Sequence, residues 1–142
     1  MQFSVQCLIS RRDKKILLVQ EGNPVCLGKW SFPGGNKNIG ETTMDAIVRE
    51  VREEVTVDIA LISWLGFYEK PFDDRLGIIF IAEIKNGEAA VGEEIIDFQW
   101  LSYAEIKKIY KRGRLRASYI LKAIDDFNRG KRYPLEAITV LS

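Results

Sequence analysis

Three glutamates stand close together in the segment REVREEV. Glu50, Glu53 and Glu54 are spaced i, i+3 and i+4, which places them on one face if the segment is helical. Like charges at these spacings repel, and the helix dipole disfavours negative charge in the C-terminal half of a helix. A divalent cation such as Mg²⁺ or Mn²⁺ would make the arrangement favourable, because both ions prefer carboxylate oxygens.

A solvated acidic surface is the competing interpretation of this helix, and an i, i+4 pair between Arg49 and Glu53 fits it. The preceding loop favours a ligand site instead. Gly34 and Gly35 allow a tight turn and a close approach of the backbone, and their N–H groups could meet phosphate oxygens. Glu41 ends this loop and could face the same cluster.

The helix itself is predicted from about Thr42 to Val55. Thr42 is a suitable N-cap, with Asp45 three residues later. At about 100° per residue the apolar residues fall on one stripe that can pack on a sheet, and the glutamates point roughly 140° away from it. This stripe is formed by Met44, Val48, Val51 and Val55.

The segment 35–57 reads G-x5-E-x7-R-E-V-R-E-E-V-T-V. It resembles the Nudix box of the Nudix hydrolases, G-x5-E-x7-R-E-U-x-E-E-x-G-U, where U is apolar. Every fixed position matches except the last glycine, where this chain has Thr56. Because a β-branched residue is poorly suited to positive φ, we expect the helix to end through a different turn at this point.

The resemblance implies a Nudix-like αβα sandwich with a mixed β-sheet between helices, of the α/β (α+β) class. It also implies metal binding by Glu50, Glu53 and Glu54, with Glu41 supporting the metal ligands. Arg49 is expected to position a carboxylate. Either Glu53 or Glu50 is expected to act on the attacking water as the base.

Further site residues are expected outside the box. Relatives often add an acid near a short tryptophan-bearing strand, and here we prefer Glu94 over Glu93 and Asp97. Phe72 and Arg75 lie on a polar loop that could reach a substrate. The basic run from Lys107 to Arg116 is expected to be a solvated helix face.

The resemblance implies hydrolysis of the pyrophosphate bond in a nucleoside diphosphate linked to another group, with Mg²⁺ as cofactor and Mn²⁺ as a substitute. A small MutT-like enzyme acting on a (d)NTP is the leading hypothesis. An ADP-ribose or sugar-nucleotide pyrophosphatase is the alternative within the class. A non-catalytic nucleotide-binding sensor is the alternative from another class, and loss of a box glutamate would favour it; all four are present.

Composition narrows the possible partners. The 142 residues include 21 basic and 20 acidic ones, a net charge of +1, so a nonspecific nucleic-acid binder is not expected. The two cysteines do not suggest a disulfide scaffold, and the absence of histidine removes it as base or metal ligand. With no signal peptide or long apolar run recognised, we expect a cytoplasmic monomer or homodimer that binds a small nucleotide and no membrane.

The order of predicted elements suggests one mixed sheet in one domain, 1–142. We expect strands at 3–9, 16–20, 58–68, 76–84 and 97–101, the first two paired as a hairpin across the turn at 11–15. Further helices are expected at 102–110, capped by Ser102, and at 115–128, followed by an irregular tail. Polar loops are expected between them.

Overall fold

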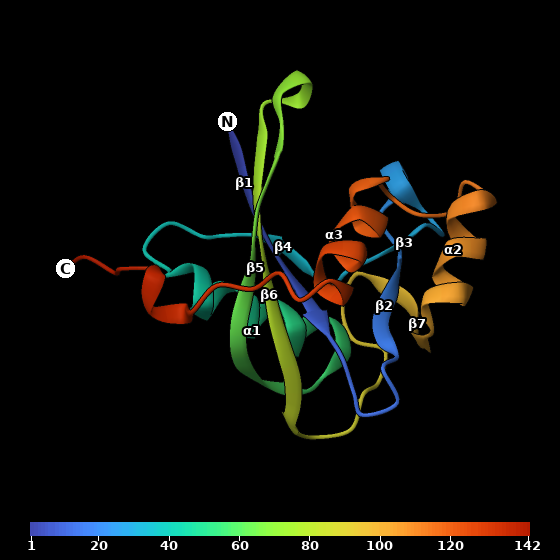
Figure 1. Cartoon of the computed structure of the whole chain (residues 1–142), viewed down its shortest axis with the longest axis horizontal. Coiled ribbons are helices and arrows are strands. Elements are labelled where there is room, and N and C mark those ends of the chain that lie inside the picture. Colours follow the sequence, from blue (N-terminus) through green and yellow to red (C-terminus); the bar gives the residue numbers. More distant parts are fainter.

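Two β-sheets form the centre of the computed structural model, which describes all residues 1–142 (Figure 1). The mixed sheet has the strand order β4-β1-β6-β5, and its strands span Gly34–Asn36, Gln2–Ile9, Arg75–Asn86 and Asp58–Lys70. The antiparallel sheet has the order β3-β2-β7, and its strands span Trp30–Ser31, Ile16–Glu21 and Ile95–Leu101. Short 3-10 turns lie at Pro24–Cys26 (η1), Pro71–Asp73 (η2) and Leu135–Ala137 (η3).

Three helices cover these sheets: α1 at Thr43–Val55, α2 at Tyr103–Lys111 and α3 at Tyr119–Asn128. The predicted N-cap of α1 is confirmed, since Thr42 Oγ1 accepts a hydrogen bond of 3.0 Å from the Asp45 N–H. The predicted cap of α2 is also confirmed, as a reciprocal capping box between Ser102 and Glu105. None of the helices has the length and apolar composition needed to cross a membrane.

The central strands β1 and β6 are apolar on both faces, which places them between two helical layers. On β6, Ile78 and Phe80 pack in one core cluster with α1, whereas Ile79 and Ile81 pack in a second cluster with α2 and α3. The side chains alternate because successive residues of a strand point to opposite faces. The expected αβα sandwich with a mixed sheet is confirmed, but the strands form two sheets and not the one mixed sheet that was predicted.

The predicted hairpin between the first two strands is wrong. β1 instead runs parallel to β6 in register, and β2 pairs with β3 and β7 in the other sheet. Only an isolated bridge between Ser10 and Ile16 joins the two strands. A short turn favours pairing of consecutive strands, but here the chain changes sheets, because β1 is buried on both faces and takes a central position.

Two segments near the C-terminus also differ from the prediction. Helix α3 begins at Tyr119 and not at Leu115, because the segment before it bonds to β3: the Trp30 N–H donates to the Arg114 carbonyl at 2.9 Å. The tail is not wholly irregular, since Tyr133 forms an antiparallel bridge with Trp64 on β5. These contacts are long-range in sequence, so local periodicity could not show them.

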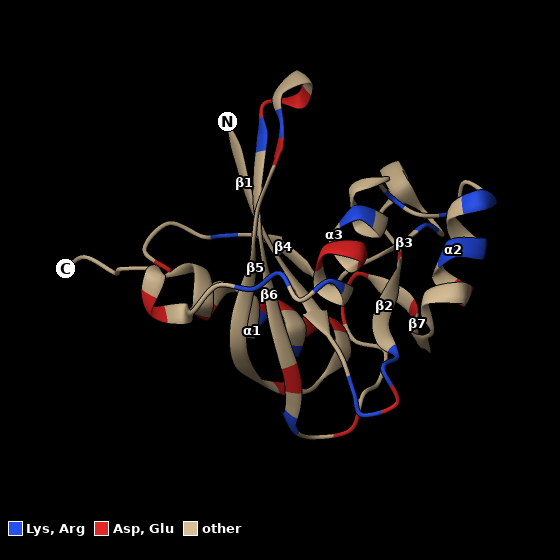
Figure 2. Ribbon diagram, in the orientation of Figure 1, with Lys and Arg blue, Asp and Glu red and all other residues tan.

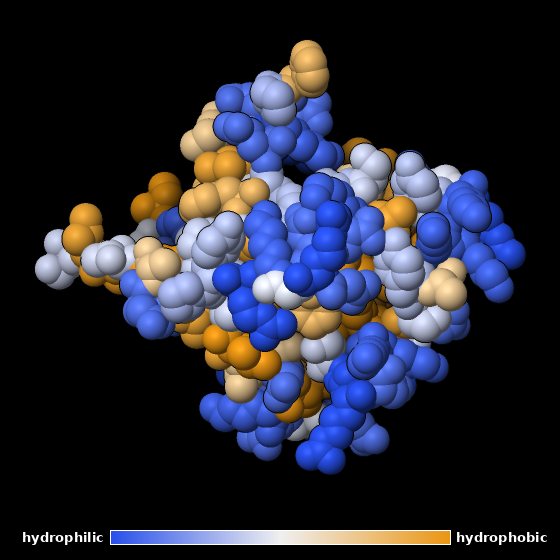
Figure 3. Space-filling model, viewed as in Figure 1, coloured by the Kyte–Doolittle hydropathy of each residue, from blue (hydrophilic) through white to orange (hydrophobic).

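Strands β5 and β6 extend beyond their predicted ends and form a hairpin that projects from the body, closed by η2 (Figure 1). Phe72 at its end is fully exposed, and in Figure 3 a hydrophobic group forms the outermost point of this arm above hydrophilic residues. Residues of both charges lie along the arm, whereas Lys and Arg gather on α2 (Figure 2). The expected loop at 70–75 is therefore the tip of a long hairpin.

Helix α1 ends at Thr56 in the left-handed conformation, with φ 62° and ψ 26°. Its N–H donates to the Arg52 carbonyl at 3.1 Å, and its Oγ1 donates to the Glu88 carbonyl at 3.3 Å. The expectation of a different turn is therefore wrong. The threonine occupies the conformation that glycine would adopt, at the cost that positive φ imposes on a β-branched residue.

Replacing Thr56 by glycine should raise the free energy of unfolding by about 1 kcal/mol, because the left-handed conformation costs glycine nothing. The gain is measured by urea denaturation in the absence of metal. Thr56→Ala is the matched control, since it removes the hydroxyl and the branch but keeps a Cβ at positive φ, and it should gain less. A glycine variant less stable than the alanine variant would contradict the explanation.

Candidate active site

A cavity of about 930 Å³ lies beside the start of α3, β4 and the C-terminal half of α1. Its acidic wall carries Glu21, Glu50, Glu54 and Glu94, and Gly34 and Gly35 line it as well. Three of these glutamates, Glu50, Glu54 and Glu94, were predicted site residues. The fold thus brings residues of the predicted box to one cavity with an acid from outside it.

Arg49 holds the acids on the outer side of α1 together. Its Nε and Nη2 donate to the two carboxylate oxygens of Glu41 at 2.6 and 3.0 Å, and its Nη1 lies 3.2 Å from both Glu50 Oε1 and Glu53 Oε2. The bidentate contact lowers the pKa of Glu41 to about 2. Glu41 and Glu53 do not line the cavity. The guanidinium is therefore engaged by carboxylates in this structure.

Glu54 is the most deeply placed acid of the cluster. It is 5% exposed, and the one hydrogen bond to its carboxyl comes from the Gly34 N–H at 2.7 Å. Burial raises its pKa to about 9, and the charges of Glu21, Glu50 and Glu94 add to the rise while the Gly34 bond opposes it. Burial also raises the pKa of Glu50, with Arg49 opposing the shift.

The glycine pair packs closely against β1 and the Glu50 side chain. A Cβ at Gly34 would lie 2.1 Å from the Val5 carbonyl oxygen, and a Cβ at Gly35 would lie 2.7 Å from the Glu50 carboxylate. At Gly34 only glycine fits against the backbone of β1, whereas a side chain at Gly35 would displace the Glu50 carboxylate. The Gly34 N–H, expected to face a phosphate, donates instead to Glu54 in this structure.

Glu94 reaches the cavity through a loop that covers the end of α1. The N–H groups of Gly92 and Glu93 donate at 2.8 Å to the carbonyls of Glu54 and Glu53. These bonds satisfy carbonyls that a helix end leaves unpaired. Gly92 is required at this point, since a Cβ there would lie 2.1 Å from the Glu53 carbonyl oxygen. The loop thus fixes Glu94 relative to the box glutamates.

The remaining predicted site residues do not all line the cavity. Arg75 lines the cavity, whereas Phe72 lies at the tip of the hairpin arm and does not. Glu93 is exposed outside the lining, and the Asp97 carboxylate accepts from the Phe98 N–H at 2.8 Å. A role for Phe72 in binding therefore stays a prediction.

Glu21, at the end of β2, was missed by sequence reasoning. It is 8% exposed, and its Oε1 accepts from Ser31 Oγ at 2.6 Å and from Arg116 Nη1 at 3.2 Å. One glutamate after an apolar run has no spacing that suggests a site. The only available signal was the two-residue period of the strand, which puts Glu21 on the same face as the buried Val19.

The donor set suits a hard divalent cation. Glu21, Glu50 and Glu54 are buried or half-buried and share one cavity with the exposed Glu94, and neither Glu54 nor Glu94 has an ion-pair partner. Carboxylate oxygens are the ligands that Mg²⁺ and Mn²⁺ prefer. The side chains are not gathered at metal-binding spacing, since no group of three or more His, Cys, Asp or Glu residues meets it. Arg49 Nη1 lies between Glu50 and Glu53 instead.

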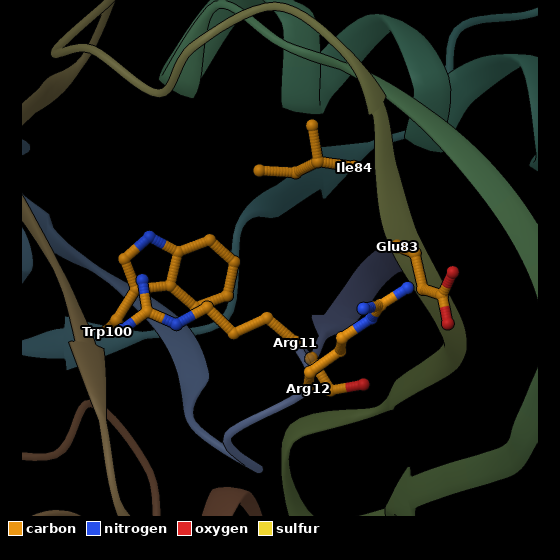
Figure 4. A pocket seen from close by; sticks show the side chains of 6 residues that line it. Arg11, Arg12, Glu83, Ile84 and Trp100 are labelled. Atoms are coloured by element: carbon orange, nitrogen blue, oxygen red, sulfur yellow. The ribbon is translucent and has the colours of Figure 1, made fainter.

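A smaller hollow of about 270 Å³ lies away from this acidic wall (Figure 4). The Arg11 guanidinium lies 4.6 Å over the Trp100 ring, and Arg12 and Glu83 flank it. No residue of α1 lines this hollow. It therefore has no part in the acidic site.

A sequence model of the NUDIX domain matches residues 1–123. The chain belongs to the NUDIX family. A solved NUDIX hydrolase from Nitrosomonas europaea has the same fold, with a TM-score of 0.86 and 26% identity, covering 99% of this chain and 97% of that one. The resemblance drawn from the Nudix box is thus confirmed.

Two curated relatives carry more specific names. An ADP-ribose pyrophosphatase of Methanocaldococcus jannaschii is 32% identical over 105 residues, which cover 71% of this chain and 62% of that protein. The NAD-capped RNA hydrolase NudC of Pseudomonas putida is 34% identical over 119 residues, covering 83% and 42%. The NUDIX chain described here therefore spans between 42% and 62% of the length of these relatives.

Without metal, Glu54→Gln should be more stable than the parent protein by about 1–3 kcal/mol at pH 7, because the parent buries a group that ionises once unfolded. The folded-state pKa is raised from 4.5 to about 9, so parent stability should fall as pH rises above 4.5 and level off above about 9. Urea denaturation in EDTA across this range measures the difference. A glutamine variant less stable throughout would contradict the burial argument.

Proposed function

We propose that the chain hydrolyses the pyrophosphate bond of a nucleoside diphosphate linked to a second group, using a divalent metal ion. The observation that carries the proposal is the joint placement of Glu50, Glu54 and Glu94 beside the glycine pair in one cavity. Membership of the NUDIX family and the names of its relatives support the reaction class.

Glu50, Glu53 and Glu54 would hold Mg²⁺ or Mn²⁺, with Glu94 as an additional ligand. When bound, such an ion neutralises phosphate charge and lowers the pKa of water. Of the box glutamates, Glu53 is 41% exposed at its side chain, so water can reach it and lose a proton to it. Glu50 is the alternative base.

Arg49 and Glu41 would act by positioning. The Arg49 guanidinium contacts Glu50 and Glu53 together, while Glu41 fixes it through two hydrogen bonds. This contact orients both carboxylates and offsets their mutual repulsion. Because its guanidinium is paired with three carboxylates, Arg49 is a poor candidate for binding substrate phosphate.

The preferred substrate is a nucleoside diphosphate joined to a sugar or a second nucleotide, such as ADP-ribose. The two curated relatives are named for ADP-ribose and for NAD-capped RNA, which favours this class over the (d)NTP suggested by the box alone. The cavity, of about 930 Å³, also has room for a group attached to the diphosphate, and the neighbouring rings of Tyr68 and Tyr119 line it.

ADP-ribose, NADH, UDP-glucose and dGTP should be compared with Mg²⁺ or Mn²⁺ present. Cleavage of ADP-ribose yields two phosphomonoesters, which release phosphate only after phosphatase is added, whereas dGTP yields pyrophosphate. We expect the first pattern. No turnover of any substrate would contradict the enzyme proposal and favour a nucleotide-binding sensor, while pyrophosphate release alone would restore the nucleoside triphosphate hypothesis.

Glu53→Gln should lower kcat for the best substrate by 100-fold or more (about 3 kcal/mol), because the amide neither takes a proton nor ligates metal well. Steady-state kinetics measures the loss. Glu136→Gln, in the exposed turn η3, is the matched control and should leave kcat unchanged. Equal kcat values for the two variants would remove Glu53 from the mechanism.

Mg²⁺ should raise the melting temperature by several degrees over EDTA-treated protein, because a ligand at 100 times its Kd adds about 2.7 kcal/mol. Thermal melts at increasing Mg²⁺ or Mn²⁺ test this. The rise should shrink in Glu54→Gln, which removes a proposed ligand. Identical melting with EDTA, Mg²⁺ and Mn²⁺ would contradict metal binding by the folded protein.

A further inference from the structure

A diphosphate presents oxygens on two phosphorus atoms, and a protein cation can bind those that a metal ion held by the acidic wall does not contact. Arg49 is engaged by three carboxylates and does not line the cavity. The cationic residues that do line it are Lys70, Arg75, Arg116 and Lys122.

Three of these four are poorly placed to act at the acidic wall. Lys122 Nζ lies 2.6 Å from Asp126 Oδ1, and Lys70 Nζ lies 5.1 Å over the Tyr119 ring. Arg75 begins β6 at the base of the hairpin tip. Arg116 alone is bonded to an acid of the cavity's acidic wall, through Glu21.

Arg116 is held in place by its backbone and its side chain. Its N–H donates to the Trp30 carbonyl at 2.9 Å, within the segment that bonds to β3. Its Nη1 lies 3.2 Å from Glu21 Oε1, which Ser31 Oγ also contacts at 2.6 Å. An arginine anchored through one nitrogen keeps a fixed direction for its remaining donors.

Those remaining donors are available. The Arg116 side chain is 43% exposed at the cavity, and no hydrogen bond engages its Nε or Nη2. A planar guanidinium with free adjacent donors matches the spacing of phosphate oxygens better than an ammonium does.

We infer that Arg116 binds a phosphate oxygen of the substrate's diphosphate, and that Glu21 is the positioning residue that orients its guanidinium. This inference rests on the proposed function. Arg116 then binds a phosphate oxygen that a metal ion held by the glutamates leaves free.

Binding of α,β-methylene-ADP, whose bridge is not hydrolysed, tests the inference by isothermal titration calorimetry with Mg²⁺. Arg116→Ala should weaken binding about 10- to 100-fold, as loss of a charge-assisted hydrogen bond does. Arg116→Lys should weaken binding less, because lysine keeps the positive charge although it lacks the paired donors of the guanidinium. The matched control, Arg112→Ala on the exposed end of α2, should bind like the parent protein.

The inference would be overturned if Arg116→Ala melted like the parent protein and bound the analogue with an affinity within twofold of it. Should the alanine variant fail to fold, equal affinity of Arg116→Lys and parent would overturn it as well. The binding measurement does not depend on turnover. If the protein hydrolyses no substrate, only the proposed function is contradicted. If it hydrolyses substrate but Arg116→Ala binds the analogue like the parent protein, only the inference about Arg116 is contradicted.

Glu21 is tested by the same titration. Glu21→Ala removes the acceptor that holds Arg116 and should weaken binding about tenfold, whereas Glu21→Gln keeps an acceptor oxygen and should restore most of it. Rescue by glutamine separates orientation of Arg116 from general packing. Equal affinity of Glu21→Ala and the parent would overturn the positioning role.

Discussion

The contact between the Glu54 carboxyl and the Gly34 N–H is the constraint on which the site depends. It joins the C-terminal half of α1 to β4 at 2.7 Å and buries a carboxyl among other acids. Such burial is unfavourable unless a cation arrives. The core cluster beneath α1 must supply the stability that this arrangement costs, and Ile47, Val51 and Val55 of the same helix pack in it.

The placement of charge follows from this constraint. Arg49 gathers the acids on the outer side of α1, and Arg116 stands at the cavity with Glu21 beside it. One arginine therefore organises the protein's own carboxylates while the other remains open to an anion. A near-neutral chain can in this way place several carboxylates and an arginine with free donors in one cavity.

Local sequence was sufficient for the acidic helix, its Thr42 cap and the capping box of α2, because caps and helical periodicity depend on neighbours within four residues. It was insufficient for the pairing of β1 with β6 and for the bond between Arg116 and Trp30, which join distant segments. The predicted turn at Thr56 was wrong for another reason. Tertiary contacts hold this residue in a left-handed conformation that threonine disfavours.

The loop that covers the end of α1 has a consequence for protein engineering. The N–H groups of Gly92 and Glu93 bond the loop to the helix that carries the glutamates. A peptide tag inserted between 88 and 94 would therefore both loosen the helix end and displace Glu94. The hairpin tip at Pro71–Asp73 is exposed and makes no contact with this helix end, so a fluorophore or an affinity tag there would leave Glu94 in place.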